Sequence, residues 1–137
     1  MPIAYRIDYD ARVVVTAGHG ILTDADVFGY QREVSSRTDA VGFDELIDMT
    51  QVVEIQLPSI DRIKDLAKTA AAADRAGSKS RLAVVAPTDY AFALGRVFEA
   101  YRRLEPKSTK EVGIFRAMDE ALAFLNLKGA PALPAIT

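Results

Sequence analysis

The chain opens with hydrophobic residues that alternate with mainly polar ones. Successive side chains of a strand point to opposite faces, so this period of two predicts a strand over residues 3–9 with one buried and one wet face. Residues 12–16 contain three consecutive valines, which favour a second strand, paired with the first as a hairpin. We expect this second strand to end at the glycines on either side of His19. The hydrophobic positions of the first strand are Ile3, Tyr5, Ile7 and Tyr9.

Three later hydrophobic segments, over residues 43–49, 81–86 and 112–115, predict further strands. The segment 81–86 is an almost unbroken apolar run, as expected for a parallel strand that is covered on both faces. Between and after these strands, hydrophobic residues recur at three- and four-residue steps, which predicts four helices. Their expected starts are at Thr23, at Ser59 or a neighbour, at Thr88 and at Ala117.

Two of these starts carry a threonine, whose hydroxyl can cap a helix. Thr23 also has Asp26 three residues later, a weaker substitute for the glutamate of a capping box. Ala117 has no capping side chain. The last helix is expected over residues 118–127, and we expect Arg102 and Arg103 to form the solvated last turn of the helix before it.

The predicted order is β-β-α-β-α-β-α-β-α. Helices that connect successive strands favour right-handed crossovers and parallel pairing. We therefore expect an α/β fold with a mixed, mostly parallel five-stranded sheet and four helices. Residues 1–127 would form one domain, and the Pro- and Ala-rich tail 128–137 would fray or dock on a neighbouring surface.

Composition narrows the possible functions. The 137 residues contain no cysteine, which excludes disulfides, thiolate metal sites and thiol nucleophiles. The net charge of -2 has interspersed signs, which argues against a nucleic-acid partner. The chain shows neither a signal-peptide pattern nor an apolar run long enough to cross a bilayer, so we expect a cytoplasmic protein with no membrane partner.

His19 is the single histidine, and alone it completes neither a zinc site nor a catalytic triad, so we expect no metal and no cofactor. Polar side chains at the expected ends of two strands are better candidates for ligand or partner binding, because open α/β sheets bind ligands at that edge. Capping and first-turn roles also account for two of them, Thr88 and Asp89. The candidates at these ends are Asp48, Thr50, Thr88 and Asp89, and His19 and Ser59 are the other two candidates for ligand or partner binding.

Aromatic side chains on the predicted helices and last strand could line a hydrophobic cavity. Stripes at helical spacing more often belong to the core, and an apolar void in the structure would reverse that preference. The set is Phe92, Phe98, Tyr101, Phe115 and Phe124.

Four segments together resemble the STAS superfamily of anti-sigma-factor antagonists and sulfate-transporter tails, and most closely its SpoIIAA-like branch of small bacterial proteins. They are YRID at residues 5–8, LIDMTQV at 46–52, VVAPTD at 84–89 and the ending 114–122. In signalling members, an Asp-Ser-Ser-Gly loop after the strand that holds the equivalent of Asp48 carries a phosphorylated serine. Counted without gaps, the acceptor position is Pro58, which has no hydroxyl. The neighbouring Ser59 is better explained as a helix cap.

Three functional hypotheses follow. The first is a non-enzymatic STAS-like regulatory or interaction module that lacks the serine switch and binds a protein partner or a second copy of itself. The second is a carrier or sensor of a small apolar ligand, which a cavity between helices and sheet would favour. The third is an enzyme that uses His19 and Asp48.

Overall fold

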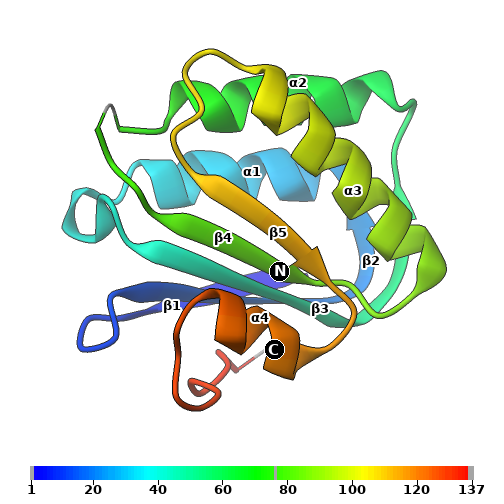
Figure 1. Ribbon diagram of the computed structural model, residues 1–137. Coiled ribbons are helices and arrows are strands. Elements are labelled where there is room, and N and C mark those ends of the chain that lie inside the picture. The colour runs from blue at the N-terminus through cyan, green and yellow to red at the C-terminus, as the bar shows by residue number, and fades with distance from the viewer. Residues whose placement is uncertain (1, 76, 136–137) are drawn as a thin grey trace.

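The computed structural model describes residues 2–75 and 77–135. Five strands form one sheet in their sequence order (Figure 1). The first pair is antiparallel and the other three pairs are parallel, which confirms the mixed, mostly parallel sheet. The strands are β1 (Ile3–Asp8), β2 (Val13–Thr23), β3 (Asp44–Gln56), β4 (Arg81–Val85) and β5 (Glu111–Phe115).

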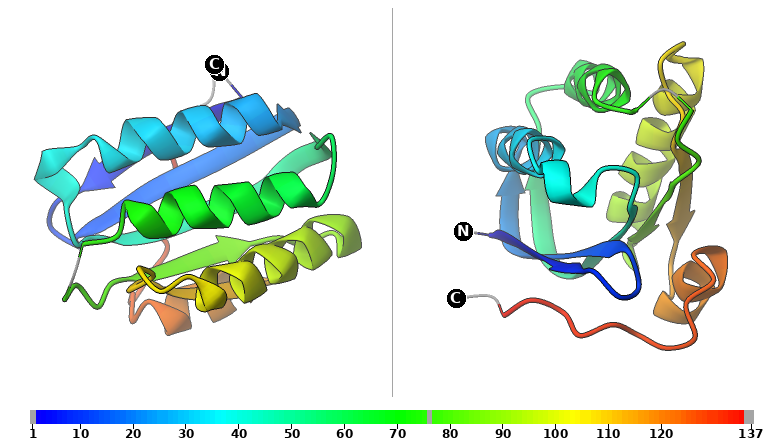
Figure 2. Two further views of the ribbon diagram at one scale, coloured as in Figure 1. Left: turned by 90° about the horizontal axis from the view of Figure 1, so that it is seen from above. Right: turned by 90° about the vertical axis from the view of Figure 1, so that its left-hand side faces the viewer.

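The helices divide between the two faces of the sheet. One face is covered by α1 (Asp24–Ser35), α2 (Asp61–Ala72) and α3 (Asp89–Leu104), and the other by α4 (Met118–Phe124) and the segment after it (Figure 2). A short 3-10 helix, Thr38–Ala40, precedes β3. The order of strands and α-helices is therefore the predicted one.

Strand β4 shows how the sequence builds two hydrophobic layers. Ala83 and Val85 pack in the cluster under α4, whereas Leu82 and Val84 pack in the cluster that includes Ala91 of α3. Alternate side chains of a strand point to opposite faces, so a continuous apolar run fills both layers. This confirms the prediction that the fourth strand is covered on both sides.

Two predicted helix caps are confirmed. Thr23 Oγ1 accepts a hydrogen bond from the backbone N–H of Asp26 at 3.2 Å, and the Asp26 carboxylate accepts from the N–H of Thr23 at 2.9 Å. Thr88 Oγ1 accepts from the N–H of Ala91 at 3.2 Å. Ala117 is the N-cap of α4, and it has an extended backbone and no capping side-chain bond.

A serine at this uncapped position should stabilise the fold. We expect Ala117→Ser to raise the free energy of unfolding by about 1 kcal/mol, because its hydroxyl can accept from an N–H of the first helical turn. The matched control is Ala123→Ser at an exposed position inside the same helix, where serine should cost a few tenths of a kcal/mol. Urea denaturation measures both, and equal effects at the two positions would refute the cap.

Strands β2 and β3 are longer than predicted. We expected β2 to end at the glycines around His19, but the strand continues to Thr23. Register shifts lie between Ala17 and His19 and again after Gly20, whose φ is 68°. The glycines are accommodated as irregularities inside the strand, where a residue with positive φ permits a bulge.

The extension of β3 corrects the expected positions of two candidates. Asp48 and Thr50 were expected at the end of the strand, but β3 runs on to Gln56, which places both within it. Asp48 is in register with Val85, the last residue of β4. Beyond that point β3 pairs with β2 alone, so the two strands project past β4.

The ends of two helices also differ from expectation. The N-cap of α2 is Ile60, with no side-chain bond, so the proposed capping role of the Ser59 hydroxyl is wrong. Helix α4 ends at Phe124 and not at residue 127, because Asn126 adopts a φ of 58°. The N–H of Leu127 then donates to the carbonyl of Leu122 at 2.9 Å, as in a Schellman motif.

The described part of the tail, residues 128–135, runs along the α4 side of the sheet (Figure 2). Arg6 Nε donates a hydrogen bond to the carbonyl oxygen of Ala132. Leu133 and Pro134 border a small hollow together with Asp48. Of the two predicted behaviours of the tail, the structure shows docking.

Candidate functional site: an internal cavity

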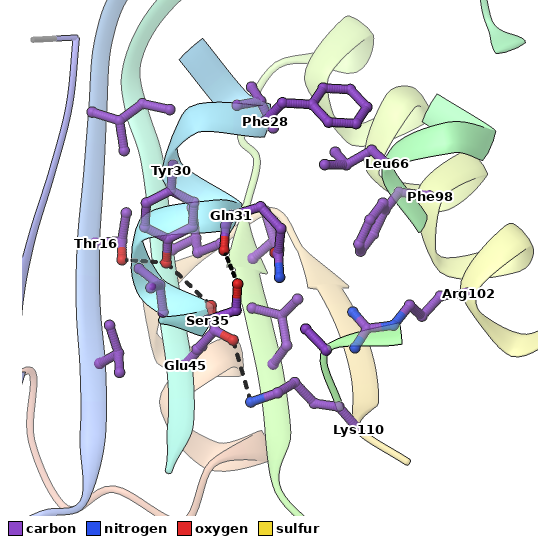
Figure 3. Close-up of a pocket in the computed structure, with 18 of the residues that line it drawn as sticks. Thr16, Phe28, Tyr30, Gln31, Ser35, Glu45, Leu66, Phe98, Arg102 and Lys110 are labelled. Carbon is purple, nitrogen blue, oxygen red and sulfur yellow. Dashed lines mark hydrogen bonds and ion pairs between the residues drawn. The ribbon is translucent and has the colours of Figure 1, made fainter. Parts of the chain in front are cut away.

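A cavity of about 250 Å³ lies between the sheet and helices α1, α2 and α3 (Figure 3). Its floor is formed by the strand residues that point toward these helices, and its walls by the inner faces of the helices. Most of the lining is aliphatic or aromatic. The apolar residues include Val14, Leu22, Val27, Phe28, Ile47, Met49, Ile63, Leu66, Leu82, Val84, Leu94 and Phe98.

Helix α1 forms one wall of the cavity. Val27, Tyr30 and Val34 recur at three- and four-residue steps along this helix, and all three line the cavity. None of the twelve residues of α1 is fully buried. The helix therefore directs its hydrophobic stripe toward the cavity, and Tyr30 of this stripe also contacts the sheet.

A polar network lies on the sheet side of the cavity. Tyr30 Oη is 2.8 Å from Thr16 Oγ1 and donates to Glu45 Oε2 at 3.1 Å. Burial, and then the charge of Glu45, raise the pKa of the Tyr30 phenol well above its usual value. The phenol therefore stays protonated, and Thr16 is the donor to it. Lys110 Nζ lies 3.2 Å from Glu45 Oε1 and donates to the carbonyl oxygen of Phe43 at 3.0 Å.

A second charged pair closes the same region. Arg102 is 3% exposed, so the prediction that it belongs to a solvated helix end is wrong. Its Nη2 donates to Asp74 Oδ1, while Asp74 Oδ2 accepts from the backbone N–H groups of Thr109 at 2.9 Å and Lys110 at 3.1 Å. The Nε atom of Arg102 is buried and has no hydrogen-bond partner. Figure 3 shows the guanidinium directed into the cavity, toward the side that holds Lys110.

None of the six sequence-predicted site residues lines this cavity. His19 is within β2, in register with Gln51, and its Nδ1 is buried without a partner. Asp48 accepts hydrogen bonds from the N–H and the hydroxyl of Thr50. The structure shows no hydrogen bond between His19 and Asp48, although both residues are described.

The remaining candidates lie elsewhere. Thr88 caps α3, and Asp89 forms an exposed ion pair with Arg116 at 2.6 Å. Ser59 precedes α2 and offers its carbonyl oxygen to the N–H of Arg62 at 3.2 Å. Thr50 remains bonded to Asp48. Within the described residues, no hydrogen bond joins Asp48 or Thr50 to Thr88 or Asp89.

Of the aromatic set proposed to line a cavity, Phe98 does so. Phe115 and Phe124 pack against each other on the α4 side, with ring centroids 5.2 Å apart. Phe92 lies under the guanidinium of Arg116, 4.4 Å from the ring centroid. The expectation of an aromatic cavity is thus met by one of these residues, and most of the lining is aliphatic.

The polar residues of the cavity were missed by the sequence analysis. Arg102 follows Phe98 by four residues and Leu94 by eight, so its spacing places it on the inner face of α3. That spacing was an available signal. Glu45 and Lys110 are far apart in the sequence, and only the fold brings them together.

Within residues 2–75 and 77–135, no group of three or more His, Cys, Asp or Glu residues is arranged to hold a metal ion. No helix in this part of the chain has the length and hydrophobicity needed to span a bilayer.

Comparisons with known proteins give a match among solved structures. No protein-family model matches the chain, and no curated protein matches its sequence. Among solved structures, it is similar to an uncharacterized protein of the DUF3478 family from Shewanella loihica PV-4, which is described as having a SpoIIAA-like fold. The two chains are 18% identical, the TM-score is 0.55, and the match covers 90% of this chain and 93% of the other. The resemblance inferred from the sequence is therefore confirmed at the level of the fold, which is SpoIIAA-like.

Proposed function

We propose that this protein binds one small, largely apolar molecule in the cavity between the sheet and helices α1, α2 and α3, as a carrier or sensor. The observation that carries the proposal is the cavity itself, with its aliphatic lining and a few converging polar groups. Ligand sites generally combine these two features. Of the three functional hypotheses drawn from the sequence, this one required an internal apolar space.

The volume sets the size of the ligand. A cavity of roughly 150 Å³ lined by aliphatic and aromatic residues holds benzene. At the same density, the 250 Å³ found here would hold about ten non-hydrogen atoms. The site is thus suited to a medium-length acyl chain or a single substituted ring, and is too small for a long-chain lipid.

The hydrophobic effect favours a ligand with apolar groups at this site. Each Å² of apolar surface that the ligand and the lining remove from water contributes roughly 25 cal/mol to binding. The aliphatic and aromatic lining supplies such surface from both the sheet and the helices.

Methyl NMR with 1-octanol as the probe tests the proposal. The expected result is saturable shifts of methyl groups that line the cavity, such as Ile63, Leu66 and Leu82. The internal control is the cluster under α4, where the methyls of Val15 and Leu46 should not move. Shifts spread over both clusters, or none at millimolar octanol, would contradict the proposal.

Self-association through an exposed hydrophobic surface is a second candidate. Where β2 and β3 project past β4, Ile21 is 51% exposed and Val53 84% exposed. Such side chains suit an interface. Light scattering of the protein and of Val53→Ser tests it: a dimer mass that falls to 14.9 kDa in the variant supports the interface. A monomer mass for the unmodified protein would reject it.

A further inference from the structure

Within the proposed ligand-binding function, on which this inference rests, we infer that the ligand carries a carboxylate and that Arg102 binds it. Arg102 is almost fully buried, yet its Nε has no acceptor. A buried donor without a partner costs about 1–3 kcal/mol, and more when it belongs to a charged group. A ligand oxygen placed beside this guanidinium would remove that cost.

The partner of Arg102 in the fold does not satisfy it. Asp74 receives one bond from Arg102, through Nη2, and its other oxygen is taken by two backbone N–H groups. The carboxylate of Asp74 therefore accepts from three donors, and one of its two oxygens binds only the backbone of the loop that precedes β5. The guanidinium forms no other hydrogen bond within the described residues.

Nearby groups favour a negative head group. Lys110 Nζ uses two of its three donors, for Glu45 and for the carbonyl oxygen of Phe43, and one remains. A cationic head group at this position would face both Arg102 and Lys110, and like charges in a poorly solvated site repel strongly.

The chemistry of the guanidinium selects a carboxylate among anions. Its planar fork matches two carboxylate oxygens, and charge-assisted hydrogen bonds are about twice as strong as neutral ones. The apolar part of the ligand would lie toward Phe28, Leu66 and Phe98, which Figure 3 shows on the opposite side of the cavity from Lys110. Octanoate has about the size that the volume allows.

Calorimetric titrations at pH 7 with octanoate, octanamide and octylammonium test the inference, because these probes share a chain and differ in the head group. We expect octanoate to bind at least ~10-fold more tightly than octanamide. The preference should disappear in the double variant Arg102→Met/Asp74→Asn, which removes the buried pair together and so avoids a stranded charge. Arg103→Met, at the exposed neighbouring position, is the matched control and should keep the preference.

The possible outcomes separate the two proposals. Equal affinity for octanoate and octanamide, or tightest binding of octylammonium, would overturn the carboxylate inference and leave the apolar site standing. If the double variant still prefers octanoate over octanamide, Arg102 does not bind the carboxylate. Absence of binding for all three probes and for 1-octanol would reject both the inference and the proposed function. The comparison of head groups uses the unmodified protein, so it does not depend on how the variants fold.

Discussion

Replacing Asp74 with alanine is expected to lower the free energy of unfolding by about 3–5 kcal/mol, the cost of leaving a buried charge without its partner. Arg102 and Asp74 have side chains only 4% and 5% exposed, so water cannot replace the lost interaction. The substitution also removes the acceptor for the N–H groups of Thr109 and Lys110. Urea denaturation, with the midpoint and slope fitted separately, measures the loss.

Two further variants separate charge from geometry. Asp74→Asn retains an oxygen for the backbone N–H groups and should cost less than Asp74→Ala. Asp65→Ala removes a carboxylate that is 58% exposed and 3.3 Å from Arg62, and should change stability by less than about 1 kcal/mol. A similar small loss for Asp74→Ala and Asp65→Ala would show that the buried pair has no special role in the fold.

Filling the cavity with a larger side chain should abolish ligand binding without unfolding the protein. Leu66 lines the cavity from α2, and Figure 3 shows its side chain next to Phe98. We expect Leu66→Trp to weaken binding of 1-octanol by at least ~10-fold, which corresponds to about 1.4 kcal/mol. The melting temperature should be unchanged or higher, because the indole adds apolar contacts within the cavity.

Leu104→Trp is the matched control for this variant. Leu104 is the last residue of α3, is 78% exposed and does not line the cavity. The Leu104→Trp variant should bind 1-octanol with the same affinity as the unmodified protein. If both tryptophan variants bind octanol normally, the ligand does not enter the cavity.

The sequence predicted the order of elements because the residues that decide it act locally. The valines of β2 are β-branched and the run of β4 is apolar. Thr23 and Thr88 cap helices through bonds to residues three positions away. These preferences hold with little help from the rest of the fold. Right-handed crossovers between successive parallel strands then place α1, α2 and α3 on one face of the sheet (Figure 2).

The errors arose where long-range contacts override local signals. Gly18 and Gly20 normally interrupt a strand, but pairing of β2 with β3 carries the chain past them. That same pairing extends β3 and moves Asp48 and Thr50 away from a strand end. The edge of a sheet depends on where its neighbours stop, which a single strand segment does not reveal.

The cavity could not be predicted, because it depends on the separation between α1 and the sheet. Val27, Tyr30 and Val34 have the spacing of a core-facing stripe, whether the space beneath is filled or empty. Arg102 was placed in solvent because arginine at a helix end usually lies there. Its partner, Asp74, lies 28 residues earlier, and only the packing of α2 against α3 brings the two together.

The most direct test of the central claim, that the cavity holds a small ligand, is non-denaturing mass spectrometry of the protein purified without detergent from its own host. We predict a mass excess equal to one molecule of about ten non-hydrogen atoms, lost on denaturation and absent from Leu66→Trp prepared in the same way. A bare mass for the unmodified protein after separate incubations with octanoate, octanamide, octylammonium and 1-octanol, or an excess of equal size in Leu66→Trp, would contradict the claim.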